Sequence, residues 1–292
     1  MGSLVELNDL LVKDGIDPKT VLVLRHRPPE RDLRKVFLSL AAERPKTYNA
    51  YQQTQGLRVE RAMQRADYVA SFIGHEAGKA LFIGLYRRRA AHPMTYEQYW
   101  RKPEYKEMGV FGMRGFVGER ESILWFDLKL TDFYREWKGR LVVDWPPPEL
   151  AWWRWADKNR IPVFAIHERS ILDAEMPPWD EMKFSWKELK LLPAKWKVAL
   201  GQWRGIYFIF DESDGKGYVG SAYGKDNILG RWLNYAKRGH GGNKELRKRD
   251  PSNFRFSILQ LGAPDTDPAE IIRLESSWKD RLHTRECGMN EN

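Results

Sequence analysis

Residues 205–222 read GIYFIFDESDGKGYVGSA, and this stretch decides the fold expected for the last third of the chain. Two apolar, aromatic-rich runs flank the polar segment DESDGKG, in which Asp214-Gly215 is a pair that favours a tight hairpin turn. The pattern predicts two antiparallel strands joined by that turn. Tyr207 and Tyr218 then lie on neighbouring strands, where their side chains can converge.

Two helices and a strand are predicted downstream of the hairpin. A helix is expected over 228–238, and Arg231 and Tyr235 share one of its faces because they are four residues apart. A strand, NFRFSILQL, follows a basic, glycine-rich segment. The last helix is expected over 268–282, after Asp267 as its N-cap, and it carries Glu275 in its middle.

This part of the chain, about residues 203–292, resembles the GIY-YIG endonuclease superfamily. Gly205-Ile206-Tyr207 and Tyr218-Val219-Gly220 match the two halves of the motif, with Val in place of the usual second Ile. Four further residues match the family pattern in the right order, namely Arg231, Tyr235, Glu275 and Asn290. The resemblance implies a small α/β nuclease domain that cuts DNA.

The resemblance also assigns roles to these residues. Glu275 would be the only side chain that ligates the catalytic divalent cation, Mg²⁺ or Mn²⁺, whose coordination shell keeps several waters. Arg231 would offer two donors to the scissile phosphate. Tyr207 would be the general base, although the pKa of a tyrosine, ordinarily ~10, must then be lowered or the phenolate stabilised. Tyr218 and Tyr235 would position water and phosphate.

Two assignments are less specific. Asn290 would hold the Glu275 or tyrosine network by hydrogen bonding. His240 lies in the glycine-rich loop and would assist a proton transfer, but an ordinary solvated loop histidine fits equally well. Each of the other motif residues also has an alternative interpretation, as a strand tyrosine or as a charge on a solvated helix face.

The charge of the chain indicates a polyanionic partner. The formal net charge is +9, and +7 of it falls within residues 1–200. We therefore expect double-stranded DNA as the partner, although a solvated basic surface would have the same composition. The candidate DNA-binding residues are Lys237, Arg238, Lys244, Arg247, Lys248 and Arg249 near the nuclease motif, and Arg87, Arg88 and Arg89 in the N-terminal region.

The N-terminal region is predicted to be an α+β domain around a curved sheet. A helix is expected over 31–43 and strands over 68–74, 80–86, 121–130, 139–145 and 161–167. The strand pattern resembles PUA-like domains, a class that includes readers of modified bases. We expect a target-recognition domain over 1–185, a connector over 186–202 and the nuclease domain over 203–292.

Two N-terminal features could contact bases or could simply pack. Trp152, Trp153 and Trp155 form a cluster that suits either a core or a stacking pocket. The amide-rich segment 51–55, YQQTQ, could read base edges or bridge a core. The sequence leaves both alternatives open.

Cysteine content and hydropathy limit the location of the protein. Cys287 is the only cysteine, so the chain can form no intramolecular disulfide and no cysteine-based zinc site. No apolar run reaches the ~18 residues that a membrane helix needs. We expect a cytoplasmic protein with no membrane partner, and the sequence leaves a homodimer open.

These features favour a DNA endonuclease of the restriction or defence type, whose N-terminal domain recognises a sequence or a modified base. One alternative is a repair, recombination or mobile-element nuclease that acts on DNA structure. Another is a DNA-binding protein with a degenerate nuclease domain, which the complete set of motif residues argues against.

Overall fold

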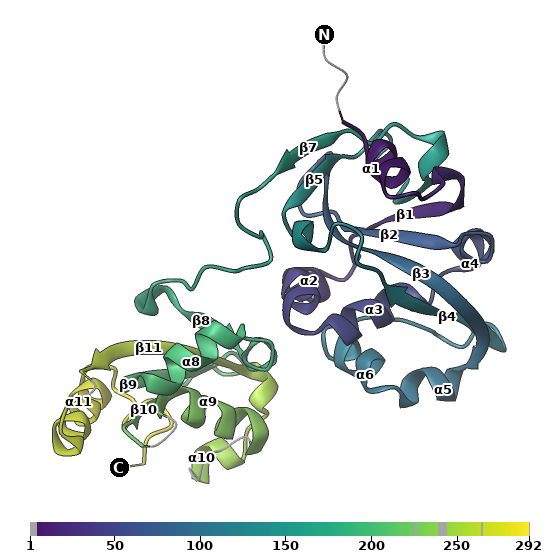
Figure 1. Cartoon of the computed structure of the whole chain (residues 1–292). Coiled ribbons are helices and arrows are strands. Elements are labelled where there is room, and N and C mark those ends of the chain that lie inside the picture. The colour runs from purple at the N-terminus through teal and green to yellow at the C-terminus, as the bar shows by residue number, and fades with distance from the viewer. Residues whose placement is uncertain (1–4, 225–226, 239–243, 264, 292) are drawn as a thin grey trace. The chain divides into compact units, whose positions relative to one another are not determined.

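The computed structural model describes residues 5–224, 227–238, 244–263 and 265–291. The chain divides into two compact units, Met1–Ala174 and Glu175–Asn292 (Figure 1). Both units combine helices with a sheet, which confirms the predicted α+β class. Within the described ranges, no helix combines the length and the apolar character that crossing a bilayer requires.

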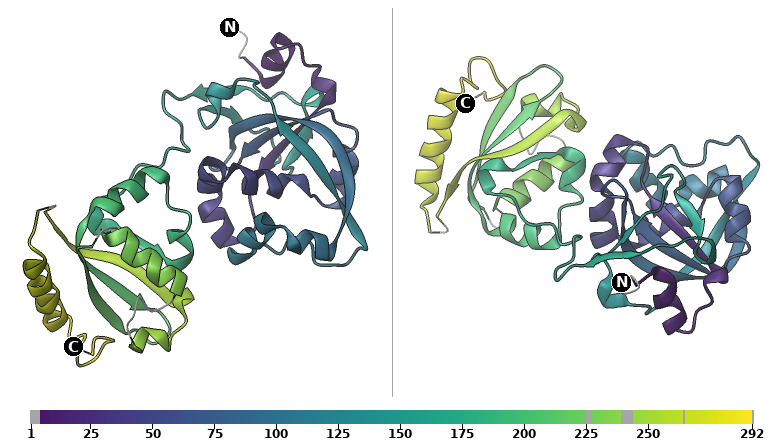
Figure 2. Two further views of the ribbon diagram at one scale, coloured as in Figure 1. Left: turned by 60° about the horizontal axis from the view of Figure 1, so that its bottom comes forward. Right: turned by 90° about the horizontal axis from the view of Figure 1, so that it is seen from above.

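The first unit is built on one curved sheet with helices packed around it (Figure 2). Its helices and strands, in chain order, are α1 (Leu7–Lys13), β1 (Val21–His26), α2 (Arg31–Glu43), α3 (Pro45–Gln53), α4 (Leu57–Met63), β2 (Tyr68–Ile73), β3 (Lys79–Thr95), α5 (Tyr96–Arg101), α6 (Pro103–Val110), β4 (Ser122–Leu130), β5 (Leu141–Asp144), β6 (Trp153–Trp155) and β7 (Val163–Ile166).

The long strand β3 organises this sheet. The strands follow the order β6-β1-β2-β3-β5-β7, and β4 pairs with the distal part of β3. The start of β3 pairs with β2 and β5, whereas the part from Tyr86 to Thr95 pairs with β4, and a bulge interrupts that ladder between Arg88 and Ala91. Because bulges bend and twist a strand, β3 turns the sheet as it leaves its centre.

Side chains of the central strands are buried on both faces. Val21 and Val23 of β1 belong to a core that includes helix α1, whereas Leu22 and Leu24 belong to a core that includes helix α4. Successive residues of a strand point to opposite faces, so this continuous apolar run fits a strand covered on both sides. The β1–β2 pair is the one parallel pair among the described strands of this sheet.

The second unit contains a four-stranded antiparallel sheet in the order β10-β9-β11-β8. Its helices and strands are β8 (Lys183–Ser185), α7 (Trp186–Leu189), α8 (Ala194–Gln202), β9 (Arg204–Asp211), β10 (Gly217–Ala222), α9 (Asn227–Arg238), α10 (Lys244–Arg247), β11 (Phe254–Gly262) and α11 (Pro268–Arg281). The predicted N-cap of the last helix is present, since Asp267 accepts a hydrogen bond from the amide of Ala269 at 2.7 Å.

The segment 186–202, predicted as a connector, is part of this unit. It forms helices α7 and α8, and its Leu189, Leu192 and Leu200 are fully or almost fully buried in the core of the unit. Strand β8, which lies in the predicted N-terminal domain, completes the sheet by pairing with β11. Without β8, the backbone N–H and C=O groups on the side of β11 that faces away from β9 would have no strand partner, and β8 provides one.

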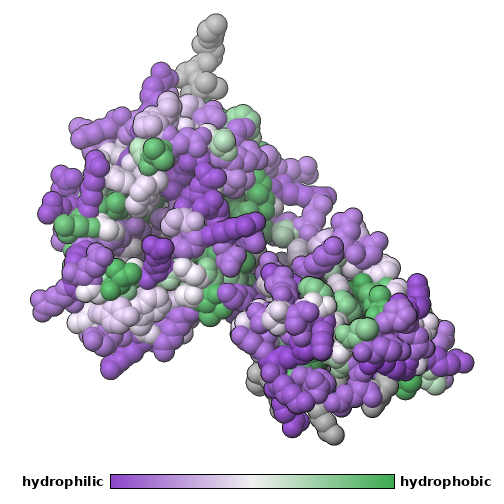
Figure 3. All heavy atoms as spheres, turned by 180° about the vertical axis from the view of Figure 1, so that it is seen from behind, coloured by the Kyte–Doolittle hydropathy of each residue, from purple (hydrophilic) through white to green (hydrophobic). Residues whose placement is uncertain are grey.

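Helices α9 and α11 cover opposite faces of the second sheet (Figures 1 and 2). Ile206 and Val219 pack with Ile271 of α11, while Tyr207 and Ile209 pack with Trp232 of α9. The face of the molecule in Figure 3 is mainly hydrophilic, with hydrophobic side chains gathered in smaller patches.

Candidate active site

The β9–β10 hairpin places Tyr207 and Tyr218 on the same face of the sheet. Tyr207 pairs with Gly220 and Tyr218 pairs with Ile209, so the two tyrosines are diagonal neighbours on adjacent strands. Both belong to the core that helix α9 covers, Tyr218 as a partly buried member. The predicted hairpin and the convergence of its two tyrosines are therefore present in the structure.

The two motif glycines are required by close packing. A Cβ atom on Gly220 would lie 2.5 Å from the hydroxyl oxygen of Tyr207, because the tyrosine ring passes directly over this glycine. Gly205 has a φ angle of +151°, and a Cβ there would collide with the carbonyl oxygen of Gln260 on β11. Glycine at these positions lets the hairpin pack against the tyrosine and against β11.

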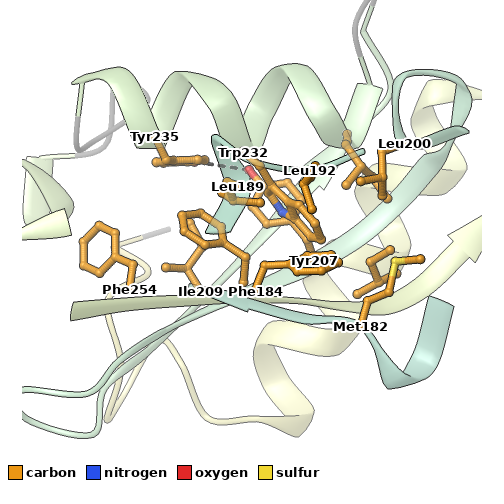
Figure 4. Close-up of a cluster of buried hydrophobic side chains, with 14 of the residues drawn as sticks. Met182, Phe184, Leu189, Leu192, Leu200, Tyr207, Ile209, Trp232, Tyr235 and Phe254 are labelled. Atoms are coloured by element: carbon orange, nitrogen blue, oxygen red, sulfur yellow. Dashed lines mark hydrogen bonds between the residues drawn. The ribbon is translucent and has the colours of Figure 1, made fainter. Parts of the chain in front are cut away.

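Tyr235 of helix α9 connects the two hairpin tyrosines. Its hydroxyl lies 3.1 Å from the hydroxyl of Tyr207, the hydrogen bond drawn in Figure 4. Its ring centroid lies 6.1 Å from those of both tyrosines. Tyr207 and Tyr235 are only 1% and 2% exposed, whereas Tyr218 is partly exposed. We call these three residues the tyrosine cluster.

Burial governs the protonation of the tyrosine cluster. It raises the pKa of Tyr207, Tyr218 and Tyr235, because a phenolate in a buried site loses its hydration. Charge interactions among the tyrosines raise these pKa values further, whereas the hydrogen bond with Tyr235 lowers the pKa of Tyr207. The charge of Glu275 adds to the rise for Tyr207 and Tyr218. The cluster is therefore neutral at physiological pH, and a phenolate within it needs a compensating positive charge.

Arg231 supplies positive charge beside the tyrosine cluster. It is exposed on α9, one turn before Tyr235. Its guanidinium lowers the pKa of all three tyrosines, which partly opposes the effect of burial. An exposed guanidinium next to buried phenols is placed to meet an anion that arrives from solvent.

Glu275 approaches the hairpin from the other face of the sheet. Its carboxylate accepts a hydrogen bond from the hydroxyl of Ser221, which is on β10 next to the motif glycine Gly220. The second oxygen, Oε1, lies 2.8 Å from Nζ of Lys279, and the side chains of Glu275 and Lys279 are 17% and 14% exposed. β10 is an edge strand, and the negative charge of Glu275 acts on Tyr207 and Tyr218 around it. Glu275 thus points inward, not to open solvent.

The surroundings of Glu275 fit a hard divalent cation. The nearby groups are a carboxylate and a serine hydroxyl, and oxygen donors of this kind are those that Mg²⁺ and Mn²⁺ prefer. The ammonium group of Lys279 already lies at the carboxylate, so a divalent cation would have to displace it or share the carboxylate with it. Within the described part of the chain, no group of three or more His, Cys, Asp or Glu side chains could hold a metal ion.

Asn290 has a different partner from the one predicted. Its Oδ1 accepts from the amide of Val219 at 2.9 Å, and its Nδ2 donates to the carbonyl of Val219 at 2.8 Å. Asn290 therefore continues the hydrogen-bond ladder of edge strand β10 instead of bonding to Glu275 or a tyrosine side chain. The reason is geometric, since a primary amide reproduces the donor and acceptor pair of a peptide group. Because Val219 lies between Tyr218 and Gly220, the hydrogen bonds of Asn290 also hold these two motif residues in place.

Several predicted basic residues can be placed. Arg247 is exposed. Lys248 is exposed and pairs with Glu245 at 2.7 Å. Arg249 contacts both Asp211 and Asp214 at 2.8 Å, so its charge is used to hold the hairpin turn. His240 and the side chains of Lys237, Arg238 and Lys244 lie outside the described residues.

The arginine run of the N-terminal unit lies on β3. Arg87 and Arg89 are exposed. Arg88 is partly buried, and its Nε donates to the carbonyl of Ala66 at 2.5 Å. The alternation of a strand explains the split, because neighbouring residues point to opposite faces. Arg87 and Arg89 are left as the candidates for contact with a polyanion.

Two residues of the site were missed from the sequence. Ser221 directly follows the second half of the motif, and its position on the strand that carries Tyr218 was the available signal. Lys279 lies four residues after Glu275 on the same predicted helix, a spacing that brings opposite charges together. Both could have been proposed from the sequence, but only the fold shows that the two groups meet at one carboxylate.

Comparison with known proteins finds a likeness for part of the chain. No family model and no curated protein matches the sequence. A solved structure of the catalytic domain of homing endonuclease I-TevI is 27% identical and covers 30% of this chain and 98% of its own. A mutant of the catalytic domain of the same intron endonuclease is 26% identical and covers 31% of this chain and 94% of its own. The TM-score is 0.26 in both cases.

Proposed function

We propose that this chain is an endonuclease that hydrolyses phosphodiester bonds in double-stranded DNA with one divalent cation, Mg²⁺ or Mn²⁺. The observation that carries the proposal is the inward-pointing carboxylate of Glu275, whose charge acts on the buried Tyr207 and the partly buried Tyr218. Arg231 adds an exposed guanidinium whose charge acts on the same tyrosines. These are the groups that phosphodiester hydrolysis needs, namely a carboxylate for a cation, a donor for phosphate and a proton acceptor.

Each group has a definite task in the proposed reaction. Glu275 would hold the cation, which when bound stabilises negative charge on the phosphate and on the leaving oxygen. Arg231 would donate hydrogen bonds to oxygens of the scissile phosphate. A water attacks phosphorus, the bond to the leaving oxygen breaks, and the products are a terminal phosphate and a hydroxyl end.

Tyr207 would accept the proton of the attacking water as a phenolate. Because burial raises its pKa, this role depends on positive charge near the hydroxyl. Arg231 supplies part of that charge. Tyr235 would hold the Tyr207 hydroxyl through their 3.1 Å hydrogen bond and so orient it toward the substrate. Tyr218, which is partly exposed, would contact the water or the phosphate.

The decisive experiment is cleavage of plasmid DNA in Mg²⁺ or Mn²⁺ by the full chain. Glu275→Gln and Arg231→Ala should each lower the rate by at least ~10²-fold while the fold is kept. The matched controls are Glu270→Gln and Arg273→Ala, which alter exposed residues of α11 and should cut like the wild type. Full activity of Glu275→Gln, or of the wild type in excess chelator, would exclude the one-cation proposal.

We further propose a restriction or defence role in which the N-terminal unit chooses the target. Support comes from the charge of the chain, since most of the net +9 lies outside the nuclease motif. A fragment of residues 175–292 is the whole second unit and keeps β8, α7, α8 and the core residues that they contribute. It should cut without the sequence or modification preference of the full chain. Digests of unmodified, methylated and hydroxymethylated DNA would measure that preference, and a fragment that keeps it would contradict the assignment.

A further inference from the structure

A pocket in the N-terminal unit is not used by the proposed nuclease site. Its volume is about 450 Å³, within the range of sites that bind small organic groups. It lies among helix α3, helix α5, the start of α4 and the segment 113–123, and we call it the aromatic pocket. The residues that matter here are Glu30, Tyr51, Gln55, Gly56, Tyr99 and Phe116.

Three aromatic rings from separate segments form the apolar walls of the aromatic pocket. Tyr99 is stacked on Tyr105, with ring centroids 3.8 Å apart and an interplanar angle of 11°. Phe116 meets Tyr99 edge to face at 6.1 Å. Tyr51 is held by Phe37, with ring centroids 4.7 Å apart. Each wall is therefore fixed by a neighbour, and flat, fixed aromatic surfaces suit a planar heteroaromatic ligand.

Glu30 gives the pocket an unsatisfied acceptor. Its Oε1 accepts a long hydrogen bond of 3.3 Å from the amide of Arg114. Its Oε2 is buried and has no hydrogen-bond partner within the described residues. A buried carboxylate oxygen without a donor is costly, so a small rotation of this side chain toward a ligand N–H group would be favourable.

An ion pair between Arg120 and the buried Glu60 fixes the opposite side of the pocket. Arg120 donates two hydrogen bonds to Glu60 of helix α4, at 3.0 and 2.7 Å, and Glu60 also accepts from the amide of Leu124 at 2.9 Å. The Glu60 side chain is 2% exposed. A bidentate pair of this kind locks the 113–123 segment to α4, so the pocket is preformed.

Helix α4 begins at the aromatic pocket with Leu57, and Arg58 and Arg61 of this helix are exposed. The lining itself also contains the acidic Glu119. Gly56 and Leu57 also line an adjoining hollow that contains Trp153, and Arg58 lies over the Trp153 ring at 5.5 Å. Exposed guanidinium groups beside an aromatic pocket are suited to a ligand that joins a planar ring to phosphates.

Two features singled out from the sequence acquire distinct roles. In the segment YQQTQ, the amide of Gln52 is buried and bonded to Asn49 at 2.9 Å, whereas Tyr51, Thr54 and Gln55 line the pocket. The tryptophans 152, 153 and 155 pack against the core that includes α4. The surface for a ring ligand is thus made by tyrosines and a phenylalanine rather than by the tryptophan cluster.

We propose that the aromatic pocket receives one unstacked nucleobase that carries an exocyclic amine, while Arg58 and Arg61 contact the flanking phosphates. The ring lies between the aromatic walls, and the amine donates to Glu30, as carboxylates accept from the amino group of cytosine. Adenine, cytosine and guanine have such an amine, and thymine does not. The inference deepens the proposed function, since it rests on DNA being the substrate of this chain.

The test blocks the pocket without disturbing the fold. Gly56 has ordinary backbone angles, φ −67° and ψ 155°, and a Cβ added there meets no atom within 4 Å. Gly56 lines the pocket, so Gly56→Phe is designed to fill its mouth. Val12→Phe is the matched control, because Val12 is 63% exposed on helix α1 and does not line the pocket. Circular dichroism and thermal unfolding establish that both variants fold.

Binding is measured by fluorescence anisotropy on the full chain in chelator, so that no cleavage occurs. The probes are short duplexes that are fully paired or that carry one adenine or one thymine mismatch, because a mismatched base costs less to extrude. The wild type and Val12→Phe should prefer the adenine mismatch over the paired duplex by roughly tenfold. Gly56→Phe should lose this preference and keep the affinity for paired DNA. Glu30→Leu, which removes the acceptor, should lose the preference for adenine over thymine.

The result is separable from the nuclease proposal. A wild type with no preference for the adenine mismatch, or a Gly56→Phe variant with the wild-type preference, overturns the base pocket even if the chain cuts DNA. A chain that fails to cut DNA in Mg²⁺ or Mn²⁺ but shows the pocket-dependent preference overturns the nuclease proposal and supports the pocket as a base-binding site.

Discussion

Nζ of Lys279 lies 2.8 Å from Oε1 of Glu275, one helical turn away on α11. Both side chains are largely shielded from solvent, and the other carboxylate oxygen of Glu275 is bonded to Ser221. The proposed cation ligand is therefore neutralised by a lysine of its own helix. A divalent cation that binds Glu275 has to displace this ammonium group or share the carboxylate with it.

Removal of the lysine should strengthen metal binding. In Lys279→Met the competing charge is lost while the alkyl chain is kept, and a pair of this kind is worth about 1 kcal/mol, or roughly fivefold in affinity. Titration of Mn²⁺ by isothermal calorimetry on the DNA-free protein measures this directly. The control is Lys248→Met, which breaks the exposed pair with Glu245. Weaker Mn²⁺ binding by Lys279→Met would mean that the lysine supports the site instead of competing for it.

A methyl group on Gly220 should displace Tyr207. Its Cβ would lie 2.5 Å from the Tyr207 hydroxyl and 2.6 Å from the ring carbon that bears it, distances that neither group can accept. We expect Gly220→Ala to lose about 1–3 kcal/mol of stability and most of the DNA cleavage. Gly224→Ala is the control, because a Cβ there meets no atom within 4 Å. Urea unfolding and plasmid cleavage give the two readouts, and wild-type values in both would refute the role assigned to this glycine.

Asn290 should contribute to stability more than a surface residue does. Asn290→Ala leaves the amide and carbonyl of Val219 without their buried partners, at a cost of roughly 2–3 kcal/mol. In the same variant, hydrogen exchange at the Val219 amide should become faster, because this amide has lost its acceptor. Glu286→Ala, at an exposed position of the same segment, should leave exchange unchanged. Unaltered protection of Val219 in Asn290→Ala would show that β10 does not need this amide.

The N-terminal unit should lose stability in mild acid because of His26. Burial lowers the pKa of His26 to about 4, while its neutral ring is hydrogen-bonded to Gln52 at 3.3 Å. The unfolded chain takes up a proton near the ordinary pKa of 6.5, and the folded chain does so only near 4. The stability that depends on neutral His26 is therefore complete above pH 6.5 and is lost as the pH falls from there to about 4, by up to ~3 kcal/mol.

Urea titrations between pH 7.5 and 4 measure this loss. His26→Gln removes the titrating group and should flatten the pH dependence of unfolding in that window. The exposed His167 serves as the control, and His167→Gln should keep the wild-type slope. An equal slope in wild type and His26→Gln would show that other groups cause the acid sensitivity.

Local signals in the sequence were sufficient for much of the second unit. The turn pair Asp214-Gly215 between two aromatic runs determined the hairpin, and helical spacing and the Asp267 cap determined α9 and α11. In the first unit the helix Arg31–Glu43 was predicted with its observed bounds. Hydrophobic periodicity and helix capping depend on residues that are close together in the chain, so both can be recognised in a single sequence.

The sequence alone did not determine which distant segments pair. β8 pairs with β11 although more than 60 residues separate them in the chain. β1 pairs in parallel with β2. Both pairings depend on which positions in the sheet the other strands leave open. The same limit applies to the sites. Sequence order suggested Tyr207, Arg231 and Glu275, and helical spacing alone places Lys279 beside Glu275. Only tertiary packing brought Ser221 to the same carboxylate, paired Asn290 with the backbone of Val219, and formed the aromatic pocket from segments far apart in the chain.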